Sequence, residues 1–380
     1  MAVYLDHNAT TPVDRRVVEA MLPFLQEHFG NPSSVYRRGR LARQSVEMAR
    51  ERVAQLVNVQ PSQVIFTSGG TEANNLAVRS SLSHSRCLAV SAVEHASVLE
   101  PAKDMSKAGG DLHVIDVDGE GMVCETSMKE ALSKLPSLVS VMMANNETGV
   151  VQDIERLASL TKAHGVIFHT DAVQAAGKMA LDFSALGTQM MSLSAHKLYG
   201  PKGVGALILD SRVELPAQML GGGHENAYRS GTENVAGIVG FGRAAELALS
   251  ELSDRSDAQL RLRKSLESKL AMLNDVVVFA QAAKRLPNTV FMAIPGIDGE
   301  ALLMELDRLG IEVSSGSACD SQKVGPSHVL TAMGVDDALA RCAVRISLGQ
   351  DNTEADVEAL VLALKQQVEI LQSNAMVAWV

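Results

Sequence analysis

The sequence predicts an α/β fold, with a mostly parallel, doubly wound sheet, helices on both faces and a smaller α+β domain. Three observations favour it. Short apolar runs alternate with segments of helical periodicity. Residues able to carry chemistry follow directly after these runs, as they do at the ligand-binding edge of open α/β sheets. The chain of 380 residues is long for a single core, which favours a large domain plus a smaller one.

The first two thirds of the chain contain the elements expected for the large sheet. Six short apolar runs predict strands, at Val64–Thr67, Cys87–Ala92, Leu138–Ala144, Val166–Thr170, Met190–Leu193 and Val204–Leu209. Three segments between them have apolar residues at helical spacing, at Glu72–Ser81, Ser97–Ala108 and Ile154–His164. Strands that read as continuous apolar runs are buried on both faces, which is typical of parallel sheets covered by helices.

The last third of the chain predicts the smaller domain. A long helical pattern from about Ala236 to Leu273 connects the two parts. After it, strands and helices alternate, with strands expected at Val276–Phe279, Thr289–Ile294 and Val344–Leu348 and helices at Gly299–Leu309 and Thr353–Leu371. We therefore predict a large domain over residues 16–254. Residues 1–15 and 255–380 are predicted to form the small domain.

Composition excludes several classes of protein. The formal net charge is −10 and no long basic run is present, so a nucleic-acid-binding surface is not expected. No apolar run approaches the ~18 residues of a membrane span, and the first residues lack the features of a secretory signal. The four cysteines show no C-x-x-C spacing, so we expect neither disulfides nor a metal site. Reduced thiols predict a cytoplasmic location.

One lysine and one aspartate point to the chemistry. Asp171 ends the run Val166–Asp171, and Lys197 closes the segment Met190–Lys197. A lysine that forms an imine with an aldehyde and a carboxylate that keeps a ring nitrogen protonated are the groups that pyridoxal phosphate (PLP) chemistry needs most. Two ordinary surface charges at strand ends would give the same pattern, so other residues must decide between the two interpretations.

We expect polar residues that follow the other predicted strands to form the rest of a cofactor site. The segment Ser68–Glu72 leads into a helix, and its Gly70 and Thr71 suit an anion held at a helix start, although an ordinary capped turn is an alternative. Gln174 follows Asp171 by three residues and could bond a ring hydroxyl. Ser194 and His196 flank Lys197 and could donate to phosphate. His95 could cover the ring face or be a buried strand-end histidine.

Three further residues suggest what the site acts upon. Cys319 lies in the small, polar run Ser314–Ser321, where a thiol would be exposed and could visit a site elsewhere; an incidental loop cysteine is the alternative. Arg345 interrupts an apolar strand pattern and needs either a substrate carboxylate or an internal ion-pair partner. Thr232 lies in the polar loop Arg229–Asn234, which has anion-binding character or is simply solvated.

Taken together, these segments resemble the cysteine desulfurases of the NifS/IscS type, which belong to the PLP-dependent transferases of fold type I. The similarity runs from Tyr4 to about Gly349. Its most diagnostic piece is Ser314–Cys319, which separates desulfurases from related aminotransferases. The other matching motifs are Tyr4–Pro12, Phe29–Ser34, Gly70–Glu72, Glu94–His95, Asn145–Gly149, Asp171–Gln174, His196–Lys197 and Arg229–Thr232. The resemblance implies a central sheet similar to the seven-stranded sheet of this fold type, and a small domain that carries the cysteine loop.

The resemblance also implies a role for each site residue. Lys197 would bind the PLP aldehyde, and Asp171 would pair with the ring nitrogen. His95 would stack on the ring and serve in acid–base catalysis, and Gln174 would bond the ring hydroxyl. The phosphate would be held by Gly70, Thr71, Ser194 and His196, together with Thr232 from the neighbouring subunit of a homodimer. Asn146 would lie against the cofactor and, with Arg345, orient the substrate L-cysteine.

The implied reaction converts L-cysteine to L-alanine and leaves a persulfide on the nucleophile Cys319. The sulfur would pass to an acceptor protein, either an iron–sulfur scaffold or a thiolation system for tRNA or DNA. Departures from the family pattern include Ala195, Asp320 and the C-terminal tail. A class V aminotransferase, a selenocysteine lyase or a non-catalytic subunit that docks sulfur carriers are the alternatives.

Overall fold

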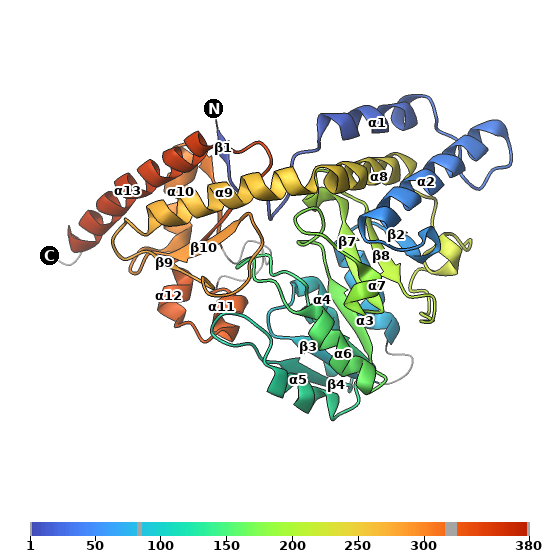
Figure 1. Ribbon diagram of the computed structural model, residues 1–380, viewed down its shortest axis with the longest axis horizontal. Coiled ribbons are helices and arrows are strands. Elements are labelled where there is room, and N and C mark those ends of the chain that lie inside the picture. The colour runs from blue at the N-terminus through green and yellow to red at the C-terminus, as the bar shows by residue number, and fades with distance from the viewer. Residues whose placement is uncertain (1, 82–85, 316–324, 378–380) are drawn as a thin grey trace.

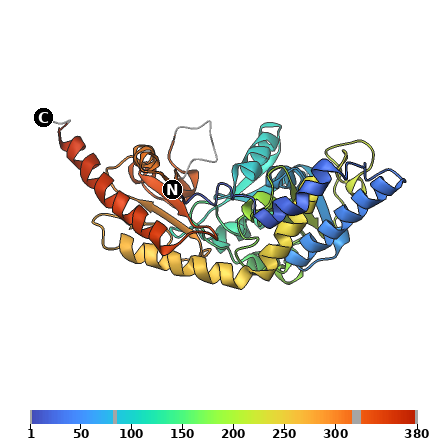
Figure 2. The ribbon, with the colours of Figure 1, turned by 90° about the horizontal axis from the view of Figure 1, so that it is seen from above.

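The computed structural model describes residues 2–81, 86–315 and 325–377, with side chains up to residue 371 (Figure 1). The chain forms an elongated molecule. The elements of the C-terminal part lie at one end and helices α1 (Arg15–Gln26) and α2 (Arg37–Leu56) at the other, as Figure 2 shows from above. The long helix α9 (Leu252–Leu270) runs through the C-terminal part from the middle of the molecule.

A seven-stranded sheet forms the large part of the molecule, in the order β2-β8-β7-β6-β5-β3-β4. All neighbouring pairs are parallel except the two that β8 makes with β7 and β2. The predicted mostly parallel sheet is therefore confirmed. Its strands are β2 (Val64–Thr67), β3 (Cys87–Ser91), β4 (Asp111–Ile115), β5 (Leu138–Ser140), β6 (Ile167–Asp171), β7 (Met190–Ser194) and β8 (Gly205–Leu209).

The edge strand β4 is an addition to the strands predicted from the sequence. Asp111 and Val114 of β4 are exposed and only Ile115 is fully buried, so the strand has no continuous apolar run by which to recognise it. The run predicted at 138–144 is also shorter as a strand, because β5 ends at Ser140.

Helices cover both faces of this sheet. On one face, α3 (Gly70–Ser80) and α4 (Ala96–Lys107) contribute side chains such as Leu76 and Val98 to a buried cluster with Ile65 and Leu207. On the other face a larger cluster includes side chains of α2, α5 (Glu125–Leu132), α6 (Ile154–Ala163), the short α7 (Phe183–Leu186) and α8 (Val235–Ser250).

The C-terminal part has its own antiparallel sheet, in the order β12-β13-β10-β9. Its elements are β9 (Val277–Val278), β10 (Thr289–Ala293), α10 (Gly299–Arg308), β11 (Ile311–Glu312), β12 (Ser314–Ser315), α11 (His328–Ala332), α12 (Asp337–Arg341), β13 (Ala343–Ser347) and α13 (Glu354–Val377). The N-terminal strand β1 (Val3–Tyr4) pairs with β11, and Leu5 packs in the core of this part. The predicted limits of the two domains stay a prediction.

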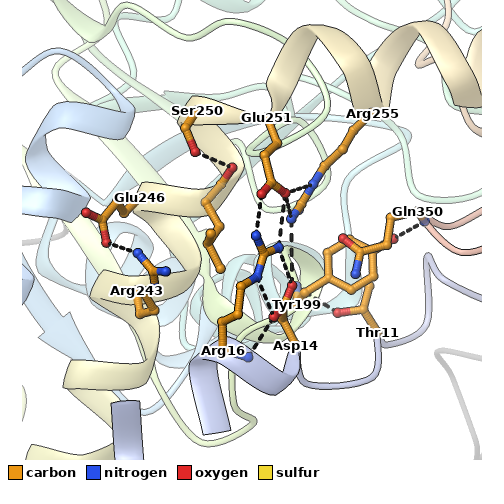
Figure 3. A network of polar contacts seen from close by, with 11 residues as sticks. Thr11, Asp14, Arg16, Tyr199, Arg243, Glu246, Ser250, Glu251, Arg255 and Gln350 are labelled. Atoms are coloured by element: carbon orange, nitrogen blue, oxygen red, sulfur yellow. Dashed lines mark hydrogen bonds and ion pairs between the residues drawn. The ribbon is translucent and has the colours of Figure 1, made fainter. Parts of the chain in front are cut away.

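The long helical pattern expected at 236–273 is two helices, because α8 ends at Ser250 and α9 begins at Leu252. An ionic network surrounds this junction (Figure 3). Glu251 binds Arg16 and Arg255, and Arg16 also pairs with Asp14. Arg255 lies 5.2 Å from the ring centre of Tyr199, whose hydroxyl accepts a hydrogen bond of 2.7 Å from the Gln350 amide. The junction thus contacts the segment that directly follows Lys197.

Candidate active site

The carboxyl edge of the large sheet borders a cavity of about 260 Å³. Segments that follow β2, β3, β5, β6 and β7 meet there, as open α/β sheets place their ligands. Nine predicted site residues line this cavity: Gly70, Thr71, His95, Asn146, Asp171, Gln174, Ser194, His196 and Lys197. Ala9, Asn74, Ser97, Met142 and Val173 complete its lining.

Lys197 reaches the cavity from the 3-10 turn η3 (Ala195–Lys197) that follows β7. The side chain is almost fully buried, and its Nζ donates hydrogen bonds to the carbonyl oxygens of Asn8 and Ala9. The N–O distance to Ala9 is 2.7 Å. These two carbonyl oxygens hold the Lys197 nitrogen beside the cavity.

Asp171 ends β6 and is held in one orientation. Its Oδ1 accepts from the Val173 amide at 2.9 Å, and its Oδ2 accepts from the Nδ2 of Asn74 at 2.6 Å. Asn74 also donates to the hydroxyl of Ser97 at 2.8 Å. This hydroxyl lies 2.7 Å from Nδ1 of His95, so a continuous chain of polar contacts joins Asp171 to His95 across one wall of the cavity.

The other end of the cavity suits an anion. Gly70 begins α3, and a Cβ at this position would lie only 2.8 Å from Cγ2 of Val173, so the backbone is approached closely there. The buried Ser194 Oγ has no hydrogen-bond partner among the described residues. The Nδ1 of His196 lies 3.2 Å from the Thr10 hydroxyl. Burial, reinforced by the charges of Lys197 and Lys202, lowers the pKa of His196 to about 4.

These residues fit PLP. The cofactor has an aldehyde, a ring nitrogen and a phosphate, and the cavity offers a lysine amine, a fixed carboxylate and a helix start beside an unpartnered hydroxyl. The orphaned Ser194 hydroxyl is the most telling of these features, because a buried polar group without a partner is costly unless a ligand satisfies it.

Arg345 lies next to this cavity rather than in its lining. It is fully buried on β13, its Nη2 lies 2.7 Å from Oδ1 of Asp6, and its Nη1 donates to the Asn146 carbonyl at 3.2 Å. Of the two interpretations that the sequence left open, the internal ion pair is therefore present. The contact with Asn146 places the guanidinium directly behind a cavity residue.

Of the other predicted residues, Thr232 lies elsewhere and Cys319 is not described. Thr232 is exposed, in the loop between η4 (Glu225–Ala227) and α8, and does not line the cavity. Cys319 lies outside the described residues. On one side of it along the chain, Ser314 of β12 pairs with Arg345, and on the other side Nε2 of His328 lies 3.0 Å from the Glu94 carbonyl oxygen.

Comparisons with known proteins identify the family of the chain. Residues 3–360 match the class V aminotransferase family. The chain is 44% identical over 378 residues to the cysteine desulfurase IscS of Anaeromyxobacter sp. strain Fw109-5, covering 97% of this chain and 93% of that protein. The crystal structure of a NifS-like protein from Rickettsia africae is similar with a TM-score of 0.90 and 36% identity, covering 97% of this chain and 100% of the other.

The chain belongs to the NifS/IscS-type cysteine desulfurases of the class V aminotransferase family. Family members are in general PLP-dependent enzymes. A further similar structure is that of SspA in complex with cysteine, with a TM-score of 0.82, 32% identity and coverage of 92% of this chain and 99% of the other. None of the described helices of this desulfurase is both long and apolar enough to cross a membrane.

Sequence reasoning missed several residues that shape the site of this desulfurase. Asn74 orients Asp171, and its signal was a polar residue on the buried side of an amphipathic helix. Asn8 contacts Lys197 from a segment 189 positions away, a pairing that no local pattern reveals. Lys178 is buried four residues after Gln174, and its signal was a lone charge after the small apolar run Ala175–Gly177.

Proposed function

We propose that this desulfurase binds PLP in the cavity at the sheet edge, removes sulfur from L-cysteine and releases L-alanine. The observation that carries the proposal is the convergence of the Lys197 amine and the fixed Asp171 carboxylate in one cavity with an anion-binding end. PLP, when bound, supplies an electron sink that makes the Cα–H bond of an amino acid acidic.

Each cavity residue then has a task. Lys197 would hold the cofactor covalently through its amine. Asp171 would keep the ring nitrogen protonated, because its negative charge attracts the proton. The 2.6 Å hydrogen bond from Asn74 fixes this carboxylate in place. His95 would cover the ring and move protons, and Gln174 would donate to the ring hydroxyl. Gly70, Thr71, Ser194 and His196 would hold the phosphate oxygens.

Substrate recognition falls to Arg345 and Asn146. The arginine side chain is suited to binding a carboxylate by two parallel hydrogen bonds, and the contact of Arg345 with the Asn146 carbonyl places it directly behind this cavity residue. The α-carboxylate of L-cysteine is the group that these residues would orient.

Cys319 is the proposed sulfur acceptor within the chain. Its thiolate attacks the substrate sulfur, so that an S–S bond forms while the substrate C–S bond breaks, and the electron pair of that bond stays on carbon and takes up a proton. L-Cysteine and a protein thiol thereby become L-alanine and a protein persulfide. An acceptor protein, an iron–sulfur scaffold or a thiolation system, would then take the sulfur.

A homodimer and a cytoplasmic location are also part of the proposal. Several apolar side chains are exposed near the Thr232 loop, among them Phe29, Val35, Tyr36 and Leu220. The segments that contain these apolar residues contact each other through Ser33 and His224, with 3.3 Å between the Ser33 Oγ and the His224 Nε2. Such a patch is typical of an interface, and a second subunit there would cover it and accept Thr232. Cys87, Cys124 and Cys342 form no disulfide among the described residues, and the cytoplasmic location is proposed from the cysteine spacing in the sequence.

The function is tested with purified protein, L-cysteine and a reductant. We expect equal amounts of alanine and sulfide, a visible absorbance band, and a borohydride-reducible adduct on Lys197 by mass spectrometry. Cys319→Ser should keep the band and lose sulfide release, whereas Lys197→Ala should lose both. A colourless wild-type protein would support the docking-subunit alternative, and turnover that requires a keto acid and survives Cys319→Ser would support an aminotransferase.

A further inference from the structure

A second lysine is buried beside the proposed cofactor site. Lys178 is 6% exposed, and its Nζ donates hydrogen bonds to Oε1 of Gln174 at 2.8 Å and to Oδ1 of Asn8 at 3.1 Å. Within the described part of the chain it forms no ion pair. A buried lysine without a carboxylate is expensive, so its two bonds to neutral amide oxygens need an explanation.

The first of these bonds decides how the Gln174 amide is turned. A lysine side chain donates hydrogen bonds, so the carbonyl oxygen of the amide must face Lys178. The amide nitrogen then points the other way, where it donates to the Asn8 carbonyl oxygen at 2.9 Å. The second N–H of this nitrogen remains for a group in the cavity that Gln174 lines. A flipped amide would present an acceptor there instead.

The second bond decides how Asn8 is turned. The Asn8 Oδ1 accepts from both Lys178 and the Nδ2 of Asn288, at 3.1 and 3.0 Å. Its own Nδ2 is thereby directed to the Asn146 carbonyl and the Thr289 hydroxyl, at 3.1 and 2.9 Å. The fully buried Asn8 thus has its side chain satisfied, and its carbonyl oxygen is held where it accepts from Lys197 and Gln174.

The charge state of Lys178 does not undo this arrangement. Burial, with the neighbouring charges of Lys197 and Arg345, holds the pKa of Lys178 well below its ordinary value. A neutral amine still has two N–H groups, which is the number of amide oxygens that it binds. In either form the lysine donates to both oxygens.

We propose that Lys178 is a positioning residue, which turns the Gln174 and Asn8 amides so that Gln174 presents a donor to the ring hydroxyl of PLP and the Asn8 carbonyl holds Lys197. The inference rests on the proposed function, because it takes Gln174 to face the cofactor. It differs from a purely structural role in that the effect of Lys178 on the ring hydroxyl passes through Gln174.

A double-mutant cycle tests the inference on the whole protein. Cofactor-free wild type, Lys178→Met, Gln174→Ala and the double variant are titrated with PLP, and the dissociation constant and the position of the visible absorbance maximum are measured. Loss of the orienting bonds should weaken binding about tenfold in Lys178→Met and shift its absorbance maximum. In the Gln174→Ala background, the same substitution should change both quantities much less.

Two control variants separate the outcomes. Lys202→Met removes an exposed lysine that also acts electrostatically on His196, and it should leave the absorbance maximum in place. Lys178→Gln replaces the amine with another hydrogen-bond donor and should weaken PLP binding less than Lys178→Met does. If Lys178→Met does not fold, Lys178→Gln takes its place in the experiment. Equal effects of Lys178→Met with and without Gln174, or no effect in wild type, would overturn the inference. A wild-type protein that binds no PLP would instead refute the proposed function.

Discussion

The guanidinium of the fully buried Arg345 lies 2.7 Å from the carboxylate of Asp6. This ion pair joins β13 of the C-terminal part to the N-terminal segment that also touches Lys197. A guanidinium is planar, and its bonds to Asp6 through Nη2 and to the Asn146 carbonyl oxygen through Nη1 fix the plane in which it lies. Asp6 therefore orients Arg345.

From this geometry we expect Arg345→Lys to raise KM for L-cysteine. An ammonium is a compact charge that cannot bind Asp6, the Asn146 carbonyl and a carboxylate in the planar arrangement of a guanidinium. Loss of a charge-assisted hydrogen bond predicts a KM about tenfold higher or more, with a smaller change in kcat. Steady-state kinetics would check this, with the exposed Arg341→Lys as the matched control. A fall in kcat at unchanged KM would contradict substrate binding by Arg345.

Glu94 predicts a pH dependence of stability. The carboxyl group is fully buried and accepts from the Ser91 hydroxyl at 2.6 Å and from the Met142 amide. Burial, assisted by the nearby charge of Asp171, raises the pKa of Glu94 to about 7 from 4.5. The titratable group next in the network is His169, which lies 2.9 Å from the Ser140 hydroxyl, and burial lowers its pKa to about 3.

The direction follows from proton linkage. Between pH 4.5 and 7 the folded protein binds more protons at Glu94 than the unfolded chain, so this group makes the protein less stable as the pH rises. Glu94→Gln removes the effect while keeping a polar group of the same shape. The free energy of unfolding of the variant, measured relative to that of wild type, should therefore rise by about 3 kcal/mol between pH 4.5 and pH 8.

Urea unfolding at several pH values would measure this difference. The exposed Glu130→Gln serves as the control for loss of one negative charge. A difference between Glu94→Gln and wild type that stays constant with pH would show that Glu94 titrates alike in the folded and unfolded chains.

The site was predictable where chemistry follows a strand. Asp171 and Lys197 come after buried apolar runs, and the carboxyl ends of parallel strands share one edge, so their meeting follows from the pattern. What links them to the rest of the molecule was not predictable. The N-terminal segment lies between β13 and Lys197. Its residue Asn8 forms hydrogen bonds with Asn146, Thr289 and Lys197, which are all distant in sequence. Such contacts depend on tertiary packing, which no local periodicity encodes.

Gly205 offers a test of the close backbone approach at the proposed phosphate end. A Cβ on Gly205 would lie 2.7 Å from the carbonyl carbon of Gly69 and 2.6 Å from the Leu193 carbonyl oxygen. Gly205→Ala must therefore displace backbone on both sides, next to Gly70 and Ser194. We expect a loss of about 1–3 kcal/mol in stability and weaker PLP binding.

Calorimetry and PLP titration would check the Gly205→Ala prediction. Gly119→Ala is the matched control, because the nearest atom to its added Cβ is 3.9 Å away. If Gly205→Ala lowers stability and leaves PLP affinity unaltered, the strain stays in the sheet and does not reach the phosphate end.

The proposed interface can be broken at its most exposed apolar residues. Val35 and Leu220 are 83% and 87% exposed in the single chain, and an aspartate buried at either position in the interface would lose its hydration without gaining a partner. We expect Val35→Asp/Leu220→Asp to be monomeric in analytical ultracentrifugation. Met272→Asp, at an exposed apolar residue after α9, should not change the oligomeric state. A monomeric wild type would refute the dimer itself.

The role of Thr232 gives the dimer a sharper test. If Thr232 donates to the phosphate of the neighbouring subunit, Thr232→Ala should weaken PLP binding about tenfold while the protein stays dimeric. Hybrid dimers of a Lys197→Ala chain and a Thr232→Ala chain would contain one site with both residues intact and one with neither. Tight PLP binding should therefore return to half of the sites in the hybrid. If instead Thr232 served its own chain, the Lys197→Ala chain would contribute no covalent site and the other chain only a weakened one, so no tight site would appear.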